Sequence, residues 1–189
     1  DDVLVHHAIV KTGRLKVQEK VQARVDAERR LRIARSHTAT HLLQWALHRV
    51  LGSEAVQAGA YNETERLRFD FSSRQGLQEE ERAKVEALVA QCVRHADPVA
   101  AQQMDLEAAK NAGALALFGE KYGGRVRVVD IGGYSKELCG GTHLPHTGLV
   151  GSFAIIAESS IAAGTRRIEA LVGGAAFERQ QQDVRVLQE

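Results

Sequence analysis

The chain has 189 residues, of which 44% are hydrophobic and 26% charged, and its formal net charge at neutral pH is +1. This composition is typical of an ordered globular domain and excludes a disordered tail. The near-neutral charge excludes a protein that grips nucleic acid over its whole surface, so any RNA contact must be local. No apolar run reaches the roughly 20 residues that span a bilayer, which excludes a membrane helix. Two cysteines cannot form a disulfide framework, as expected of a cytoplasmic protein.

The first segment, residues 3–27, has loosely alternating valines and leucines around Thr12-Gly13. This pattern predicts two or three short strands with a tight turn. Alone they would bury too little apolar surface to form a domain, so residues 1–27 are expected to be the last strands of a small β-barrel. Because the chain does not begin with Met, we also expect it to be a piece of a longer protein.

A helix is predicted over residues 26–51, where apolar side chains recur at helical spacing and Gly52 follows as a helix-stop residue. After it, residues 67–71 alternate between apolar and charged side chains, which is typical of a half-buried strand. The alternation places Arg68 and Asp70 on the face opposite the core.

The second half of the chain changes from helices to strands. Residues 77–95 form an amphipathic pattern with Cys92 on its apolar stripe, and a short helix is predicted over 105–112. The predicted strands, separated by glycine-rich turns, are 125–131, 135–139, 150–158 and 165–172. This order predicts an α+β domain over residues 28–174, with a mainly antiparallel sheet and packed helices. A polar helix over 175–188 is expected to begin a C-terminal linker segment, 175–189.

Two distant segments carry side chains suited to holding a metal ion. His37 and His41 are four residues apart in a predicted helix, so both imidazoles project from one face about one turn apart. Residues 139–143, Cys-Gly-Gly-Thr-His, add a thiolate and a third imidazole on a turn that the two glycines permit. Sulfur and nitrogen ligands favour Zn²⁺ over Mg²⁺ or Ca²⁺. The sequence therefore predicts one zinc site, formed by His37, His41, Cys139 and His143.

Each motif alone has an ordinary alternative, namely a pair of helix histidines that touch the core or solvent, and a simple glycine turn. Their occurrence together in one chain favours the metal site. A metalloprotease of the HExxH type is excluded, because it needs a Glu beside the first His as general base and position 38 is Thr. An unrelated zinc hydrolase would need a carboxylate near the metal, and the spacing reveals none.

Five stretches of the sequence are distinctive together: Arg35–Leu43, Leu67–Phe71, Ala116–Tyr122, Glu137–His143 and Ala163–Glu169. In this order they resemble the editing domain of alanyl-tRNA synthetases and the free-standing AlaX trans-editing proteins. The stretch ELCGGTH is highly specific, since the related editing domain of threonyl-tRNA synthetase has a different sequence around its Cys. The resemblance implies an ester hydrolase that removes serine or glycine wrongly attached to the tRNA for alanine, as part of a synthetase or, alternatively, as a free-standing deacylase.

By this resemblance the four ligands hold one zinc ion, Gln57 lies in the editing pocket, and Thr40 helps to read the hydroxyl of the substrate side chain. The family pattern after that Gln commonly runs to Gly-Ser, whereas Ala60 here has no hydroxyl, so no polar contact is assigned to it. The implied partners are the acceptor end of tRNA(Ala) carrying a wrong amino acid and the remainder of the synthetase chain. Candidate substrate- and RNA-binding residues are Arg68, Asp70, Gly140, Gly141, Arg166 and Arg167.

Two further groups have both a functional and an ordinary interpretation. Arg29, Arg30, Arg32 and Arg35 form a dense run that either contacts phosphate or is a solvated helix face. Tyr122 or Phe118 either stacks on the terminal adenosine or closes the core.

An aminoacyl ester is already activated, so its hydrolysis needs a positioned water and charge stabilisation more than a strong nucleophile. Two mechanisms follow. Either a ligand loosens and zinc contacts the substrate or water, or zinc only shapes the pocket while Gln57, Thr40 and backbone amides near Gly140-Gly141 hold the water. The alternative from another class is a zinc-stabilised tRNA-docking module without catalysis of its own.

Overall fold

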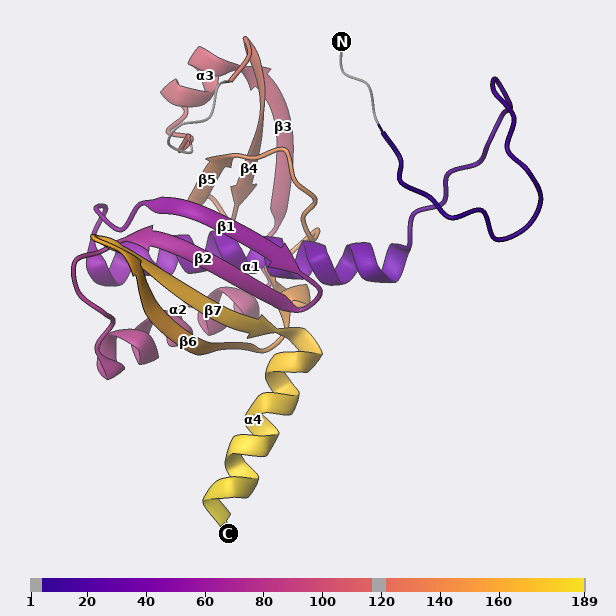
Figure 1. Ribbon diagram of the computed structural model, residues 1–189. Coiled ribbons are helices and arrows are strands. Elements are labelled where there is room, and N and C mark those ends of the chain that lie inside the picture. Colours follow the sequence, from indigo (N-terminus) through magenta and orange to yellow (C-terminus); the bar gives the residue numbers. More distant parts are fainter. Residues whose placement is uncertain (1–4, 117–121, 189) are drawn as a thin grey trace.

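The computed structural model describes residues 5–116 and 122–188. Helices pack on antiparallel sheets, which confirms the predicted α+β class (Figure 1). The helices are α1 (Ala27–Leu51), α2 (Glu79–His95), α3 (Leu106–Asn111), the 3₁₀ helix η1 (Thr147–Val150) and α4 (Gly173–Gln188). The strands are β1 (Gln57–Glu63), β2 (Arg66–Ser72), β3 (Val99–Asp105), β4 (Arg125–Ile131), β5 (Ser135–Leu138), β6 (Phe153–Ala162) and β7 (Thr165–Val172).

The central helix α1 has the signals that its sequence predicts at both ends. It begins after Asp26, whose side chain accepts a hydrogen bond from the backbone N–H of Arg29, and it ends at Gly52, where φ is 95°. Most residues between Ala34 and Leu47 are buried, polar ones included. The helix therefore runs through the core, and its middle turns lie in a largely dry environment.

The larger sheet has the strand order β1-β2-β7-β6, with every neighbouring pair antiparallel. Alternation along β2 buries Leu67, Phe69 and Phe71. In Figure 1, α1 and α2 lie behind this sheet. Their apolar side chains and the inward side chains of β2, β6 and β7 form one continuous core.

The smaller sheet has the order β3-β4-β5, again antiparallel. Its strand β4 contributes Val129 and Ile131 to the main core. Val126 and Val128 belong instead to a separate, smaller cluster with Leu138 of β5. Because β5 leads directly into residue 139, this sheet places Cys139 and His143, the second pair of predicted ligands, next to α1.

The strands predicted near the N-terminus are not formed. Residues 5–26 contain no helix or strand, so this described part of the chain shows no strand of the expected barrel. Its apolar side chains are largely exposed: Ile9 is 84% exposed and Val17 is 95% exposed. A short alternating segment without partner strands is marginally stable at best. The alternation of apolar residues was therefore not sufficient to predict strands in this segment.

Other boundaries differ slightly from those predicted. The strand expected over 150–158 begins at Phe153, because residues 147–150 form η1. The single expected sheet is divided into two. Among the described residues, no helix combines the length and apolar character needed to cross a membrane.

Candidate metal centre

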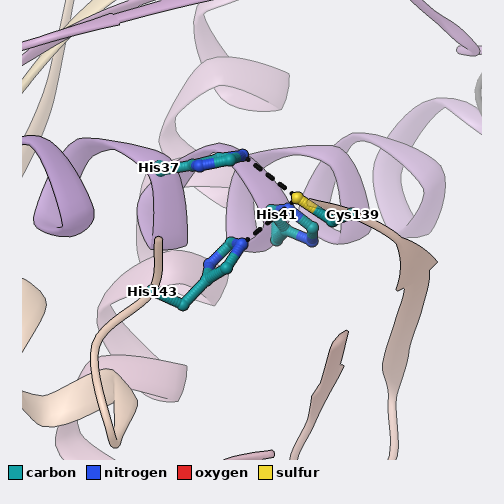
Figure 2. Close-up of side chains that lie close together, drawn as sticks. All are labelled: His37, His41, Cys139 and His143. Carbon is teal, nitrogen blue, oxygen red and sulfur yellow. Dashed lines mark hydrogen bonds between the residues drawn. The ribbon is translucent and has the colours of Figure 1, made fainter. Parts of the chain in front are cut away.

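The four predicted ligands converge, although His37 and Cys139 are 102 positions apart. Figure 2 shows His37 and His41 on one face of α1, opposite Cys139 and His143 from the loop after β5. One ligand atom from each residue lies within 4.8 Å of all the others. The Cys139 Sγ is 3.4 Å from His37 Nε2 and 3.3 Å from His143 Nε2.

The two sulfur–nitrogen separations fit a tetrahedral zinc site. Bonds of about 2.3 Å to sulfur and about 2.0–2.1 Å to nitrogen place neighbouring ligand atoms roughly 3.3 to 3.6 Å apart at tetrahedral angles. Both sulfur–nitrogen distances lie in that range. The group of one thiol and three imidazoles could therefore hold a metal ion, as the sequence predicts.

The electrostatics of the group favour a thiolate. Burial by itself would raise the pKa of the Cys139 thiol, but hydrogen bonds from the three imidazoles outweigh it and lower the pKa from 9.0 to about 3. Burial by itself would lower the pKa of His41, yet its contacts with Cys139 and Glu137 raise the pKa from 6.5 to about 9. Since the thiolate is the metal-binding form of cysteine, the site holds its sulfur in the required state.

The metal-free protein is expected to have a reactive thiolate at Cys139 in mildly acidic buffer. A thiol with a lowered pKa stays ionised down to that value, so its alkylation by iodoacetamide should keep a nearly constant rate between about pH 5 and pH 8. Buried Cys92, whose pKa is raised by burial, should not react. Peptide mapping by mass spectrometry measures both rates. A Cys139 rate that rises about tenfold per pH unit, as for an ordinary thiol, would contradict the expectation.

A carboxylate that the sequence analysis did not find orients one of the imidazoles. Glu137 is only 6% exposed, and one of its oxygens lies 3.2 Å from His41 Nδ1. Its other oxygen accepts a hydrogen bond of 3.1 Å from Ser135 Oγ. Once the ring has lost one proton to bind a metal ion, a carboxylate beside Nδ1 keeps the remaining proton there, and Nε2 is the nitrogen that would face the ion. The available signal was position: Glu137 precedes Cys139 by two residues, so strand alternation puts both on one face.

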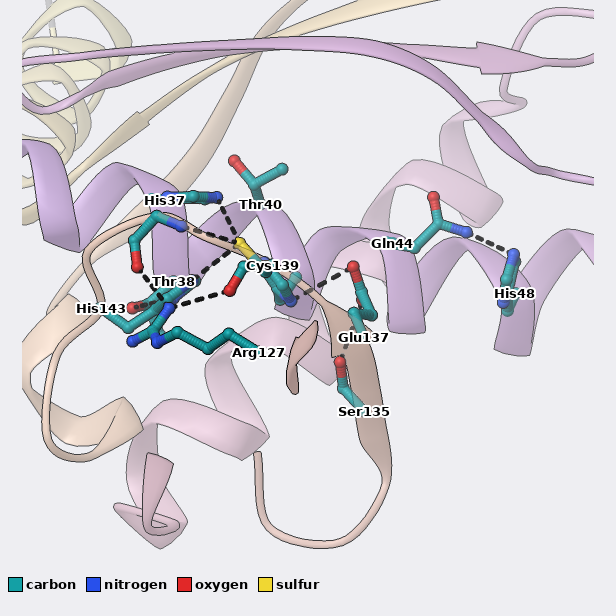
Figure 3. A network of polar contacts seen from close by, with 12 residues as sticks. His37, Thr38, Thr40, Gln44, His48, Arg127, Ser135, Glu137, Cys139 and His143 are labelled. Atoms are coloured by element: carbon teal, nitrogen blue, oxygen red, sulfur yellow. Dashed lines mark hydrogen bonds and ion pairs between the residues drawn. The ribbon is translucent and has the colours of Figure 1, made fainter. Parts of the chain in front are cut away.

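Two more side chains hold the ligand loop in place (Figure 3). The Oγ1 atom of Thr38 lies 3.3 Å from His143 Nδ1 and accepts a 3.1 Å hydrogen bond from the Leu144 backbone N–H. Thr38 occupies the position where an HExxH protease would need its Glu. Arg127 Nη1 donates to the carbonyl oxygens of Cys139 and Gly141 at 2.9 and 2.7 Å. The loop is thus fixed from α1 on one side and from β4 on the other.

A cavity of about 420 Å³ lies beside the candidate metal centre, lined by His37 and Cys139 among others. Gln57 lines it from β1, as do Gly140 and Gly141 from the ligand loop. Thr40 is buried next to it and reaches it indirectly, because its hydroxyl lies 2.7 Å from the side-chain oxygen of Asn62, which also lines the cavity.

The remaining candidate residues lie on the larger sheet and do not line this cavity. Asp70 and Arg167 are cross-strand neighbours joined by two hydrogen bonds of 2.7 and 2.8 Å. Arg166 makes a similar pair with Glu158, at 2.6 and 2.9 Å. Arg68 is exposed on β2. An RNA-binding role for these residues stays a prediction. All four already have a partner within the sheet, since the Arg68 guanidinium lies 5.6 Å from the ring centroid of Tyr61 on β1.

The alternatives left open for the aromatic and arginine residues are partly resolved. Tyr122 packs against the smaller core, and Phe118 lies outside the described residues. Within the arginine run, Arg32 and Arg35 each pair with a glutamate.

Comparisons with known proteins show what the chain is similar to. Residues 126–169 match the family described as "Threonyl and Alanyl tRNA synthetase second additional domain". The chain is 51% identical to alanine–tRNA ligase 1 of Lachnoclostridium phytofermentans over 92% of its length, and 49% identical to alanine–tRNA ligase of Streptococcus mutans over 97%. It is 50% identical to the chloroplastic/mitochondrial alanine–tRNA ligase of Oryza sativa subsp. indica over 94%. It spans 20%, 21% and 18% of these relatives, respectively, or about a fifth of their length. The resemblance read from the motifs is confirmed.

Proposed function

Because the chain belongs with the alanyl-tRNA synthetases in sequence, we propose that it is the editing module of such an enzyme, and that it hydrolyses the ester of tRNA(Ala) mischarged with serine or glycine. The observation that carries this proposal is the cavity of about 420 Å³ that opens directly against His37 and Cys139. A purely structural ion needs no such space beside it. One zinc ion, the acceptor end of tRNA(Ala), the rest of the synthetase and a cytoplasmic location are parts of the proposal.

The donor set suits zinc, and His37, His41, Cys139 and His143 would hold it. When bound, zinc supplies a Lewis acid that polarises a carbonyl or lowers the pKa of water. The described residues that surround the ligands fix their orientation, so that the chelating atoms are arranged before any ion arrives.

The cavity residues supply binding and orientation. Gln57 and Asn62 present amide groups that can hold an ester and a water molecule by hydrogen bonds. The Gly141 N–H is directed at the Cys139 sulfur at 3.5 Å, so in this proposal the amide of Gly140 is the one offered to the developing oxyanion. Thr40 fixes the Asn62 amide, and through it acts on the substrate side chain.

A deacylation assay tests the proposal, with Ser-tRNA(Ala) as substrate and Ala-tRNA(Ala) as the correctly charged control. The zinc-loaded chain should release serine and spare alanine. Gln57→Trp should slow serine release by about 100-fold, because a bulky ring displaces the ester from its reacting position. Tyr61→Trp is the matched control, since Tyr61 is exposed on the same strand and outside the cavity. Equal rates in both variants, with zinc content unchanged, would remove Gln57 from the site.

One observation favours a second function. The four side chains together would fill a tetrahedral shell around a zinc ion, as in structural zinc sites, whereas catalytic sites usually keep one position open. The chain would then be a zinc-stabilised tRNA-docking module without turnover. The same assay separates the two functions, because a docking module binds tRNA and leaves Ser-tRNA(Ala) intact.

A further inference from the structure

A second and larger cavity, of about 710 Å³, adjoins the candidate metal centre. Its wall includes Arg30 and Leu31 from the first turns of α1, Arg127 from β4, and His143. Gly140 and Gly141 line this cavity and the smaller one alike, so the ligand loop forms the wall that they share. Its volume lies within the range of roughly 300 to 1,000 Å³ that is usual for small-molecule sites.

The larger cavity carries positive charge without compensation. No carboxylate is among the described residues that line it. Arg127 holds the ligand loop through Nη1 (Figure 3), and its other two guanidinium nitrogens make no hydrogen bond or ion pair with the described residues, 5–116 and 122–188. The Arg30 side chain has no ion pair with any residue of 5–116 or 122–188, whereas Arg32 and Arg35 on the same helix do. Two guanidinium groups are therefore available to an anion.

The cavity also offers an apolar surface next to these charges. Leu31 is 44% exposed, and Val25 and Ala34 also line the cavity. A planar base can lie against such a surface, while guanidinium groups bind phosphate oxygens with their forked donors. An apolar wall beside a pair of arginines is thus suited to a nucleotide unit.

We propose, resting on the function proposed above, that this cavity receives the last two nucleotides of the tRNA acceptor strand, with their connecting phosphate between Arg30 and Arg127. The aminoacyl ester at the end of the strand then reaches past the shared Gly140-Gly141 wall into the smaller cavity. Of the four arginines before His37, only Arg30 lines the cavity, so the contact is local, as the near-neutral charge of the chain requires.

The binding test uses the zinc-loaded chain, the dinucleotide cytidylyl-adenosine, and adenosine as a probe without phosphate. Isothermal titration calorimetry should show tighter binding of the dinucleotide. Arg30→Glu should weaken dinucleotide binding at least tenfold and leave adenosine binding within twofold, because only the phosphate contact is lost. The slope of log affinity against log salt should fall by about 0.7 for that lost contact.

Arg29→Glu is the matched control, since it makes the same charge change at the neighbouring exposed position, outside the cavity. It should change dinucleotide affinity less than twofold. Thermal unfolding of both variants reports whether the fold is intact. Equal weakening by the two variants, or dinucleotide binding no tighter than that of adenosine, overturns the inference.

Deacylation kinetics separate this inference from the proposed function. Arg30→Glu should raise the KM for Ser-tRNA(Ala) about tenfold with little change in kcat, because Arg30 touches the strand and not the ester. A chain that deacylates normally but fails the dinucleotide test refutes only the cavity assignment. A chain that passes the dinucleotide test and never releases serine refutes only the editing function.

Discussion

Replacement of Cys139 by Ala is expected to eliminate zinc binding at the candidate centre and to abolish deacylation of Ser-tRNA(Ala). The sulfur lies within 3.4 Å of two imidazole nitrogens and is the group's only anionic ligand, so its loss leaves three neutral donors and an open corner. The effect should exceed the roughly 10–100-fold loss of affinity that follows removal of a ligand's outer hydrogen-bond partner. Elemental analysis of the purified variant, with chelator competition for the affinity, measures it.

The control for this substitution is Cys92→Ala. Cys92 is 3% exposed and packs in the main core, and it is not one of the four candidate ligands. Its truncation should cost stability on the order of 1 kcal/mol and leave one zinc ion per chain. A Cys139→Ala variant that retains one tightly bound zinc ion, or metal-free protein with undiminished activity, would refute the catalytic metal centre.

Gly141→Ala should disrupt the centre nearly as severely, although it removes no ligand. A Cβ atom at position 141 would lie 2.0 Å from Cε1 and 2.4 Å from Nδ1 of His37. Atoms cannot approach so closely, so the imidazole must leave the position in which it faces Cys139. We expect zinc affinity to fall by about 100-fold or more, as for other changes that disorient a ligand.

Gly140→Ala provides the comparison at the adjacent position. A Cβ atom there would have no heavy atom within 4 Å. Both substitutions stiffen the unfolded chain to the same extent, so the difference between them isolates the collision with His37. Zinc titration monitored by competition should place Gly140→Ala within twofold of the unaltered chain. Similar losses in the two variants would show that the loop needs glycine for its backbone and not for the space beside His37.

The sequence predicted best those elements whose apolar residues recur at a regular spacing and whose ends are marked by turn residues. Strands β4 and β7 were expected at their observed residues, because apolar side chains alternate between glycine-rich turns. Strands β1 and β3 were not predicted. Both lie at the edge of their sheets and expose most of their side chains, so burial imposes little pattern on their sequences. The reverse error affected residues 5–26, where an alternating pattern has no partner.

The ligands of the candidate centre were predictable because each pair is local in sequence, one on a helix face and one on a glycine turn. Their supporting residues were not. Thr38 and Arg127 act through tertiary contacts that no sequence pattern marks. For Glu137, strand alternation indicates a face shared with Cys139 but not the contact with His41. The different surroundings of Gly140 and Gly141 likewise depend on where His37 comes to lie.

The division of apolar side chains between two cores has a mechanical consequence. His37 and His41 lie on the central helix α1. Cys139 and His143 follow β5, whose sheet has its own small cluster of apolar residues. An ion bound by both pairs would link the central helix to the smaller sheet. Part of its binding free energy would then stabilise the packing of the sheet against the helix. Affinity for the ion and alignment of the two cavities on either side of the loop are therefore a single, linked property of the chain.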